Sequence, residues 1–125
     1  MDASAVPADV AATFCATLVD EWVANGVTQA VIAPGSRSTV MALALAGDER
    51  LSVQVVHDER SAAFIALGVG LATGVPAVVV CTSGTAATHF YAAVVEAHLS
   101  AVPMIVCTTD RPPELRDVGA PQTID

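Results

Sequence analysis

The sequence predicts a single α/β domain with a doubly wound, mainly parallel sheet and helices on both faces. Short runs of almost continuous apolar residues recur four times along the chain, and each is separated from the next by a stretch long enough for a helix. Strands that are apolar almost throughout are typical of a parallel sheet covered on both faces. With 125 residues and 54% hydrophobic content, the chain is long enough for one buried core.

The first half of the chain is expected to form two helices and two strands. Apolar residues spaced by four predict a helix over residues 8–25, which ends at Asn25-Gly26. Its buried stripe is predicted to consist of Val10, Phe14, Leu18 and Trp22. A strand over 29–33 follows, and after a Pro-Gly turn Ser38 is placed to cap a helix that reaches about Ala46. The second strand is expected over 51–56.

The second half repeats the alternation of strand and helix. Helices are predicted over 59–73 and 84–100, and strands over 77–81 and 104–108. From Asp110 onward the chain is polar, broken by proline and irregular. Residues 122–125 form neither a capped helix nor a charged tail, so we expect a domain over 1–125 that is cut short at its C-terminus.

Charge and cysteine content exclude several classes of function. The net charge is -8 and all five basic residues are arginines, which argues against nucleic-acid binding and against an anionic membrane surface. No apolar run approaches the roughly 18 residues of a membrane span, and the start lacks the basic segment of a signal peptide. Three cysteines without a C-x-x-C spacing are read as reduced core residues of a cytoplasmic protein. The isolated histidines 57, 89 and 98 favour structural roles, and no metal site is expected in this chain.

A polar motif directly follows each predicted strand, at 35–38, 58–60, 82–85 and 108–111. The carboxyl ends of parallel strands meet at one edge of a sheet, so these motifs should lie together and suit anionic or heteroaromatic ligands. Structural readings stay open: Asp58 and Glu59 could simply cap a helix, and the Pro-Gly turn needs no ligand. The motif after the third strand resembles a phosphate loop but lacks the P-loop spacing and its lysine.

Five sequence blocks in one order resemble one enzyme family. They are Ala-Pro-Gly-Ser-Arg-Ser (33–38), Asp-Glu-Arg-Ser-Ala-Ala (58–63), Cys-Thr-Ser-Gly-Thr-Ala (81–86), Ala-Val-Val-Glu-Ala (93–97) and Asp-Arg-Pro-Pro-Glu-Leu-Arg (110–116). Together they resemble the MenD family, the 2-succinyl-5-enolpyruvyl-6-hydroxy-3-cyclohexene-1-carboxylate synthases of menaquinone biosynthesis, which use thiamine diphosphate. The resemblance runs from about Phe14 to Ile124 and implies a pyrimidine-binding domain.

The resemblance also implies a role for particular residues. Glu59 matches the glutamate that activates the cofactor by hydrogen bonding to ring nitrogen N1' of its aminopyrimidine, so it is the expected catalytic residue. Cofactor binding is expected from Glu59, Thr82, Ser83 and Gly84. Substrate binding is expected from Ser36, Arg37, Arg111 and Gln122. The chain departs from the family at Pro121, where the family usually has Asn, so an amide donor and a backbone N–H are missing.

The implied reaction decarboxylates 2-oxoglutarate and adds the resulting carbanion to isochorismate. The central domain and the domain that holds the diphosphate and Mg²⁺ are absent from this chain, which alone is expected to be inactive. In the complete protein the resemblance implies a homodimer or homotetramer. Two alternatives remain: another thiamine-diphosphate decarboxylase or carboligase of 2-oxoacids, or a stand-alone, non-catalytic α/β ligand-binding module.

Overall fold

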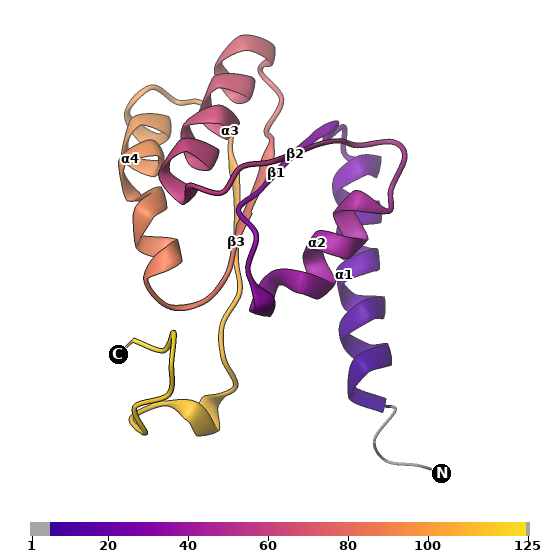
Figure 1. Ribbon diagram of the computed structural model, residues 1–125. Coiled ribbons are helices and arrows are strands. Elements are labelled where there is room, and N and C mark those ends of the chain that lie inside the picture. Colours follow the sequence, from indigo (N-terminus) through magenta and orange to yellow (C-terminus); the bar gives the residue numbers. More distant parts are fainter. Residues whose placement is uncertain (1–5, 125) are drawn as a thin grey trace.

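A computed structural model describes residues 6–124 and contains a four-stranded parallel sheet. Figure 1 shows its strands between two groups of helices. The strands are β1 (Gln29–Ile32), β2 (Ser52–Val55), β3 (Val78–Cys81) and β4 (Ile105–Thr108). Their order across the sheet is β2-β1-β3-β4, and Ile32 of β1 lies between Val55 and Val80 of its neighbours. The predicted α/β class with a parallel sheet is therefore confirmed.

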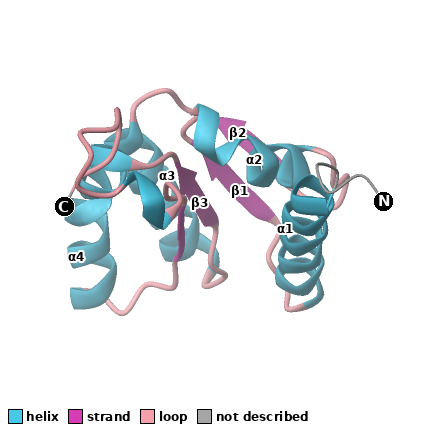
Figure 2. Ribbon diagram, turned by 90° about the horizontal axis from the view of Figure 1, so that it is seen from below, coloured by secondary structure: helices cyan, strands magenta, loops and turns pink. Residues whose placement is uncertain are grey.

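The helices cover the two faces of the sheet in pairs (Figures 1 and 2). They are α1 (Val6–Ala24), α2 (Thr39–Ala46), α3 (Glu59–Thr73) and α4 (Tyr91–Leu99). On one face Ile32 and Val80 pack with α1 and α2, where Leu45 is fully buried. On the other face Val31 and Val79 pack with alanines of α3 and with Phe90, which precedes α4. Alternate residues of the two central strands thus serve two separate cores, as the period of a strand requires.

The predicted buried stripe of α1 is wrong in part. Val10 and Phe14 are each 62% exposed, whereas Cys15 and Val19 face the sheet and Leu18 and Trp22 are half-buried. A step of four residues advances about 400° around an α-helix, so a stripe spaced by four drifts by about 40° per step. Because α1 is apolar on most of its circumference, the sequence pattern does not determine which side meets the sheet.

The expectation that every strand is buried on both faces also needs correction. All four residues of β3 are buried and β1 is nearly so, but β2 is largely exposed and β4 is exposed at alternate residues. The strands β2 and β4 are the two edges of the sheet, and each has only one neighbour. Their apolar composition therefore reflects one covered face rather than two.

The predicted helix over 84–100 is not α-helical throughout. It begins as a 3₁₀ helix, η2 (Gly84–Phe90), and becomes α-helical only at Tyr91. Two further 3₁₀ turns are η1 (Ser36–Ser38) and η3 (Pro113–Leu115). Ser38 stands at the predicted cap position of α2, but its hydroxyl donates to the carbonyl oxygen of Gly35 at 3.0 Å instead of capping the helix.

The three cysteines are free thiols, as expected: Cys15 and Cys81 are buried and Cys107 is half-buried. Among the residues that the structure describes, no helix is both long enough and apolar enough to cross a membrane.

Candidate functional site

The strand order places a topological switch point between β1 and β3. The chain leaves β1 through α2 toward one edge of the sheet, and it leaves β3 through η2 and α4 toward the other edge. The chain therefore runs in opposite directions across the sheet after β1 and after β3, and ligands of doubly wound folds bind at such a switch point. The segment after β4 (residues 109–124, the tail) lies below the carboxyl ends of the strands in Figure 1.

A hollow of about 430 Å³ opens at this end of the sheet. Its lining comes from the start of α3, from the loop after β3 with η2, and from the tail. The lining residues are Glu59, Thr82, Ser83, Thr85, Ala86, His89, Gln122, Thr123 and Ile124. Three segments that are far apart in the sequence thus enclose one space, and Glu59 is the only acidic residue among the described residues that line it.

Asp58 and Glu59 have different positions at the start of α3. Asp58 is the N-cap, and its carboxylate accepts a hydrogen bond of 2.7 Å from the backbone N–H of Ser61. Hydrogen bonds from Ser61 lower the pKa of Asp58, and the charges of His89 and Arg60 lower it further. Glu59 is the first residue of the helix, is half-buried and lines the hollow. The capping interpretation is therefore correct for Asp58, which leaves Glu59 available for a ligand.

Three residues that line the hollow, Thr82, Ser83 and Thr123, have buried hydroxyl groups without a described hydrogen-bond partner. Thr82 is 6% exposed and Ser83 is 3% exposed, and no described residue hydrogen-bonds the hydroxyl of either one. A buried polar group without a partner costs about 1–3 kcal/mol. Two such groups side by side, next to a half-buried carboxyl, indicate a surface built to hydrogen-bond a ligand.

Close backbone packing holds the loops of the site together. A side chain at Gly35 would collide with Thr82, so the loop after β1 lies directly against the loop after β3. A side chain at Gly84, which has φ of +76°, would meet the backbone of Gln122 at 3.0 Å. The hydroxyl of Thr109 donates to the carbonyl oxygen of Cys81 at 3.1 Å and ties the tail to the end of β3.

The thiol of Cys81 lies close behind this site. Burial, and then the nearby charge of Glu59, raises the pKa of Cys81 to about 11. The thiol therefore stays protonated at neutral pH and is a poor nucleophile. Cys81 belongs to the core beneath α3, where it packs with alanines of that helix.

A match to a known family decides the identity of the fold. Residues 12–125 match the family model described as the thiamine pyrophosphate enzyme, N-terminal TPP binding domain. The chain belongs to this family.

Relatives of this domain carry the name that the five sequence blocks predicted. The chain is 56% identical over 113 residues to the 2-succinyl-5-enolpyruvyl-6-hydroxy-3-cyclohexene-1-carboxylate synthase of Bacillus pumilus, over 90% of this chain and 20% of the relative. It is also 56% identical to the synthases of the same name from Geobacillus kaustophilus, over 94% of this chain and 20% of the relative, and from Chloroflexus aurantiacus, over 88% and 19%. The chain thus spans about a fifth of the length of these curated relatives. The resemblance to the MenD family is confirmed.

The residues of the TPP-binding domain fit the aminopyrimidine end of such a cofactor. That ring offers nitrogen acceptors and an amino donor, and the hollow offers a carboxyl on Glu59 and the unpartnered hydroxyls of Thr82 and Ser83. The described residues contain no cluster of histidine, cysteine, aspartate or glutamate that could hold a metal ion.

The residues predicted to bind substrate lie at the same edge but in different surroundings. Gln122 lines the hollow. Ser36 and Arg37 are exposed on the loop after β1 and do not line it. Arg111 is half-buried, and its buried Nε atom has no hydrogen-bond partner among the described residues. Of the predicted cofactor residues, Glu59, Thr82 and Ser83 line the hollow, and Gly84 packs against Gln122.

Two lining residues were not anticipated as site residues, namely His89 and Thr123. His89 follows the Thr-Ser-Gly-Thr motif closely enough to share its helical segment, and that proximity is the signal that could have found it. Thr123 has no such signal, because only the fold of the tail brings it to the hollow.

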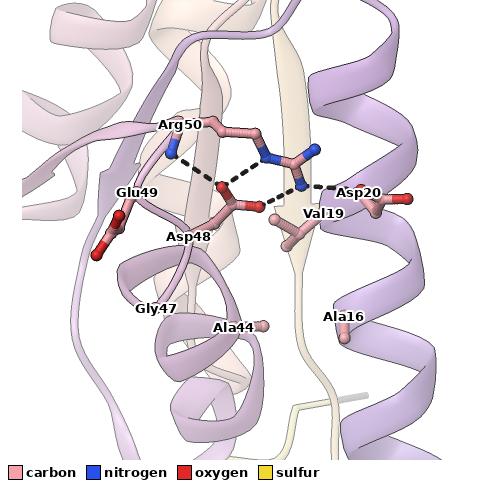
Figure 3. Close-up of a pocket in the computed structure, with 8 residues that line it drawn as sticks. All are labelled: Ala16, Val19, Asp20, Ala44, Gly47, Asp48, Glu49 and Arg50. Carbon is pink, nitrogen blue, oxygen red and sulfur yellow. Dashed lines mark hydrogen bonds and ion pairs between the residues drawn. The ribbon is translucent and has the colours of Figure 1, made fainter.

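A second hollow lies at the opposite end of the sheet and has a structural explanation (Figure 3). Arg50 donates hydrogen bonds to Asp48 at 2.6 and 2.9 Å and to Asp20 of α1 at 2.8 Å. The hydrogen bonds from Arg50 lower the pKa of Asp48 to about 2. These three charges are paired with one another and join α1 to the loop before β2.

Proposed function

We propose that this chain is the pyrimidine-binding, N-terminal part of a synthase that decarboxylates 2-oxoglutarate and adds the resulting carbanion to isochorismate in menaquinone biosynthesis. The observation that carries the proposal is the half-buried carboxyl of Glu59 in one hollow with the unpartnered hydroxyls of Thr82 and Ser83. The names of relatives that are 56% identical give the product, and the resemblance to the MenD family supplies the two substrates.

Glu59 is the proposed catalytic residue. Thiamine diphosphate, when bound, supplies the nucleophilic carbon that the decarboxylation of a 2-oxoacid requires. The carboxyl oxygen of Glu59 holds a proton toward a ring nitrogen of the aminopyrimidine and so favours its reactive tautomer. Thr82 and Ser83 would hydrogen-bond that ring, and the close packing of Gly84 on Gln122 keeps the tail at the hollow.

We propose that Ser36, Arg37, Arg111 and Gln122 bind the substrates. Both proposed substrates are anionic, while the chain carries a net charge of -8. Local arginine side chains must therefore overcome the repulsion of the whole domain, and a planar guanidinium pairs with a carboxylate through two hydrogen bonds. Arg37 is exposed and Arg111 keeps a donor without a described partner, so both have unused hydrogen-bonding capacity.

The remaining parts of the proposal concern the complete protein. Its diphosphate and Mg²⁺ ligands are proposed to lie in a further domain, and the protein to be a homodimer or homotetramer. Its free cysteines favour the cytoplasm, where thiols stay reduced.

Replacing Glu59 with Gln in the full-length protein tests the catalytic assignment. The amide keeps the shape of the side chain but cannot share a proton in the same way, so we expect turnover to fall by about 100-fold or more. The affinity for thiamine diphosphate should fall only modestly. Glu49→Gln is the matched control, because Glu49 is exposed at the far end of the sheet. A fully active Glu59→Gln enzyme would refute the assignment.

The same full-length protein separates the proposed reaction from its alternatives. Product formation from 2-oxoglutarate and isochorismate supports the synthase, whereas product from pyruvate without isochorismate indicates another thiamine-diphosphate carboligase. Binding of a small ligand with no turnover of either substrate indicates a non-catalytic module.

A further inference from the structure

We propose that His89 is the group that exchanges protons between solvent and Glu59. This inference rests on the proposed function, because it assigns a proton route to the same hollow. In each exchange an N–H bond of the imidazolium breaks and an O–H bond forms on the carboxylate of Glu59, directly or through a water molecule. The neutral imidazole then takes a proton from solvent or buffer, and the reverse sequence returns a proton from Glu59 to solvent.

The first argument is the composition of the hollow. Among its lining residues, only Glu59 and His89 have side chains that ionise near neutral pH or below. The others are hydroxyl, amide or apolar side chains. Imidazole is the side chain that both gains and loses a proton readily near pH 7. Among the described lining residues, His89 is therefore the one ionisable side chain that is available to pass a proton between water and Glu59.

The second argument is the position of His89. The neighbouring Phe90 is 1% exposed and belongs to the core beneath α3, so the end of η2 is firmly anchored. His89 itself is exposed, whereas Glu59 is half-buried. His89 thus lies at the rim of the hollow, in contact with water, while Glu59 lies further in.

The third argument is electrostatic. The charge of His89 lowers the pKa of Asp58, so the imidazole is close to the start of α3. The ionisable groups there are Asp58, Glu59 and Arg60. The described tail residues that line the hollow are Gln122, Thr123 and Ile124, and none of them ionises. Two carboxylates against one guanidinium leave a net negative charge at this end of the hollow.

The test measures proton exchange separately from turnover. In the full-length protein loaded with thiamine diphosphate and Mg²⁺, near-ultraviolet circular dichroism reports the protonation state of the bound aminopyrimidine. After a rapid pH jump, the relaxation rate of this signal should be about tenfold slower in His89→Gln than in the unmodified protein. The affinity for the cofactor and the final spectrum should stay unchanged.

Two further variants distinguish proton exchange from a structural role. In His89→Ala, added imidazole should restore the relaxation rate, which a purely structural role would not allow. His98→Gln is the matched control, because His98 is an exposed histidine at the end of α4 that does not line the hollow. Its relaxation rate should match that of the unmodified protein.

The outcomes separate this inference from the function on which it rests. If His89→Gln relaxes at the normal rate, or imidazole does not restore His89→Ala, the role of His89 is wrong even though Glu59→Gln removes the pH-dependent signal. If Glu59→Gln keeps the full signal and full turnover, the proposed role of Glu59 is wrong and that of His89 is wrong with it.

Discussion

Asp58 and Glu59 are adjacent acidic residues, and their positions at the start of α3 give them different roles. Asp58 stands outside the helix and accepts the N–H of Ser61, whereas Glu59 begins the helix and lines the hollow. A helix N-terminus has N–H groups that need acceptors, so the cap also fixes the direction in which the next side chain leaves the backbone. Removing the cap should therefore disturb Glu59 as well.

The capping role of Asp58 predicts a pH-dependent stability difference. The pKa of Asp58 is lowered in the folded protein, so its contribution is complete above about pH 4, the ordinary value, and is lost as the pH falls through the folded value. At pH 7 we expect the Tm of Asp58→Ala to be a few degrees lower than that of the unmodified chain. This difference should shrink as the pH falls below about 4.

Asp58→Asn is the matched control for this prediction. Asparagine caps helices about as well as aspartate but carries no charge. Its Tm should lie close to that of the unmodified chain at pH 7. A difference between Asp58→Ala and the unmodified chain that persists undiminished at pH 2 would show that the carboxylate does not cap α3.

The hydroxyl of Ser83 predicts opposite effects on stability and on cofactor affinity. It is buried without a described partner, so Ser83→Ala should raise the free energy of unfolding of the ligand-free protein by about 1 kcal/mol. In the full-length protein the same change should weaken the binding of thiamine diphosphate by about five- to tenfold. Denaturant unfolding and titration calorimetry measure the two effects.

Ser52→Ala serves as its control, because Ser52 is exposed on the edge strand β2. Its effect on the free energy of unfolding should be within about 0.5 kcal/mol, with no effect on affinity. If Ser83→Ala destabilises the ligand-free protein and leaves affinity unchanged, the hydroxyl has a structural partner and does not bind the ligand.

At the scale of single residues, the sequence could identify what lies on the strand-to-helix junctions. Glu59, Thr82 and Ser83 were predicted because parallel strands bring their following loops to one edge. Thr123 could not be predicted, because it belongs to an irregular tail without hydrophobic periodicity. Its position depends on left-handed backbone at Gln122, with φ of +56°, which no composition rule foresees at a glutamine.

Two glycines of α3 test how this element packs. A side chain at Gly70 would collide with the carbonyl oxygen of Pro103 and approach Cγ1 of Val102 to 2.9 Å, so α3 lies directly on the segment before β4. A side chain at Gly68 would meet nothing within 4 Å. Glycine-to-alanine substitutions at these two positions should therefore change the free energy of unfolding in opposite directions.

We expect Gly70→Ala to lower the free energy of unfolding by about 1–3 kcal/mol, because the backbone of Pro103 must move. Gly68→Ala should raise it by about 0.5–1 kcal/mol, because alanine reduces the entropy of the unfolded chain and favours a helix. Denaturant unfolding of the two variants measures both signs. Equal stabilisation by both substitutions would contradict the close contact between α3 and Pro103.

At the scale of elements, the sequence predicted the positions of the helices α1–α4 and the strands β1–β4, but not the 3₁₀ form of η2 or the exposure of the edge strands. The strands at 29–32, 52–55, 78–81 and 105–108 all fall within the predicted runs. The 3₁₀ form of η2 could not be foreseen, because a 3₁₀ turn and the first turns of an α-helix share the same residue preferences. The exposed edges could not be foreseen either, because strand order is a property of the assembled sheet.

At the scale of the whole molecule, the order β2-β1-β3-β4 is what creates the site. It places the divergence of the chain between β1 and β3, where Gly35 packs against Thr82. The acidic character of the domain, by contrast, disfavours the binding of a phosphorylated ligand. With a net charge of -8, and with Glu59 in the hollow, the chain repels a diphosphate unless cations are supplied nearby.

This balance predicts that the 125-residue chain and the full-length protein respond differently to thiamine diphosphate. A ligand stabilises the folded state by RT ln(1 + [L]/Kd), so a ligand at 100 times its Kd contributes about 2.7 kcal/mol. With millimolar cofactor and Mg²⁺, the Tm of the full-length protein should rise by several degrees, whereas that of the chain should rise by less than about one degree. Because the described residues contain no metal-binding cluster, leaving out Mg²⁺ should remove most of the shift in the full-length protein and none in the chain. A large, Mg²⁺-dependent shift in the 125-residue chain would show that it holds the diphosphate by itself, and that the assignment of this task to a further domain is wrong.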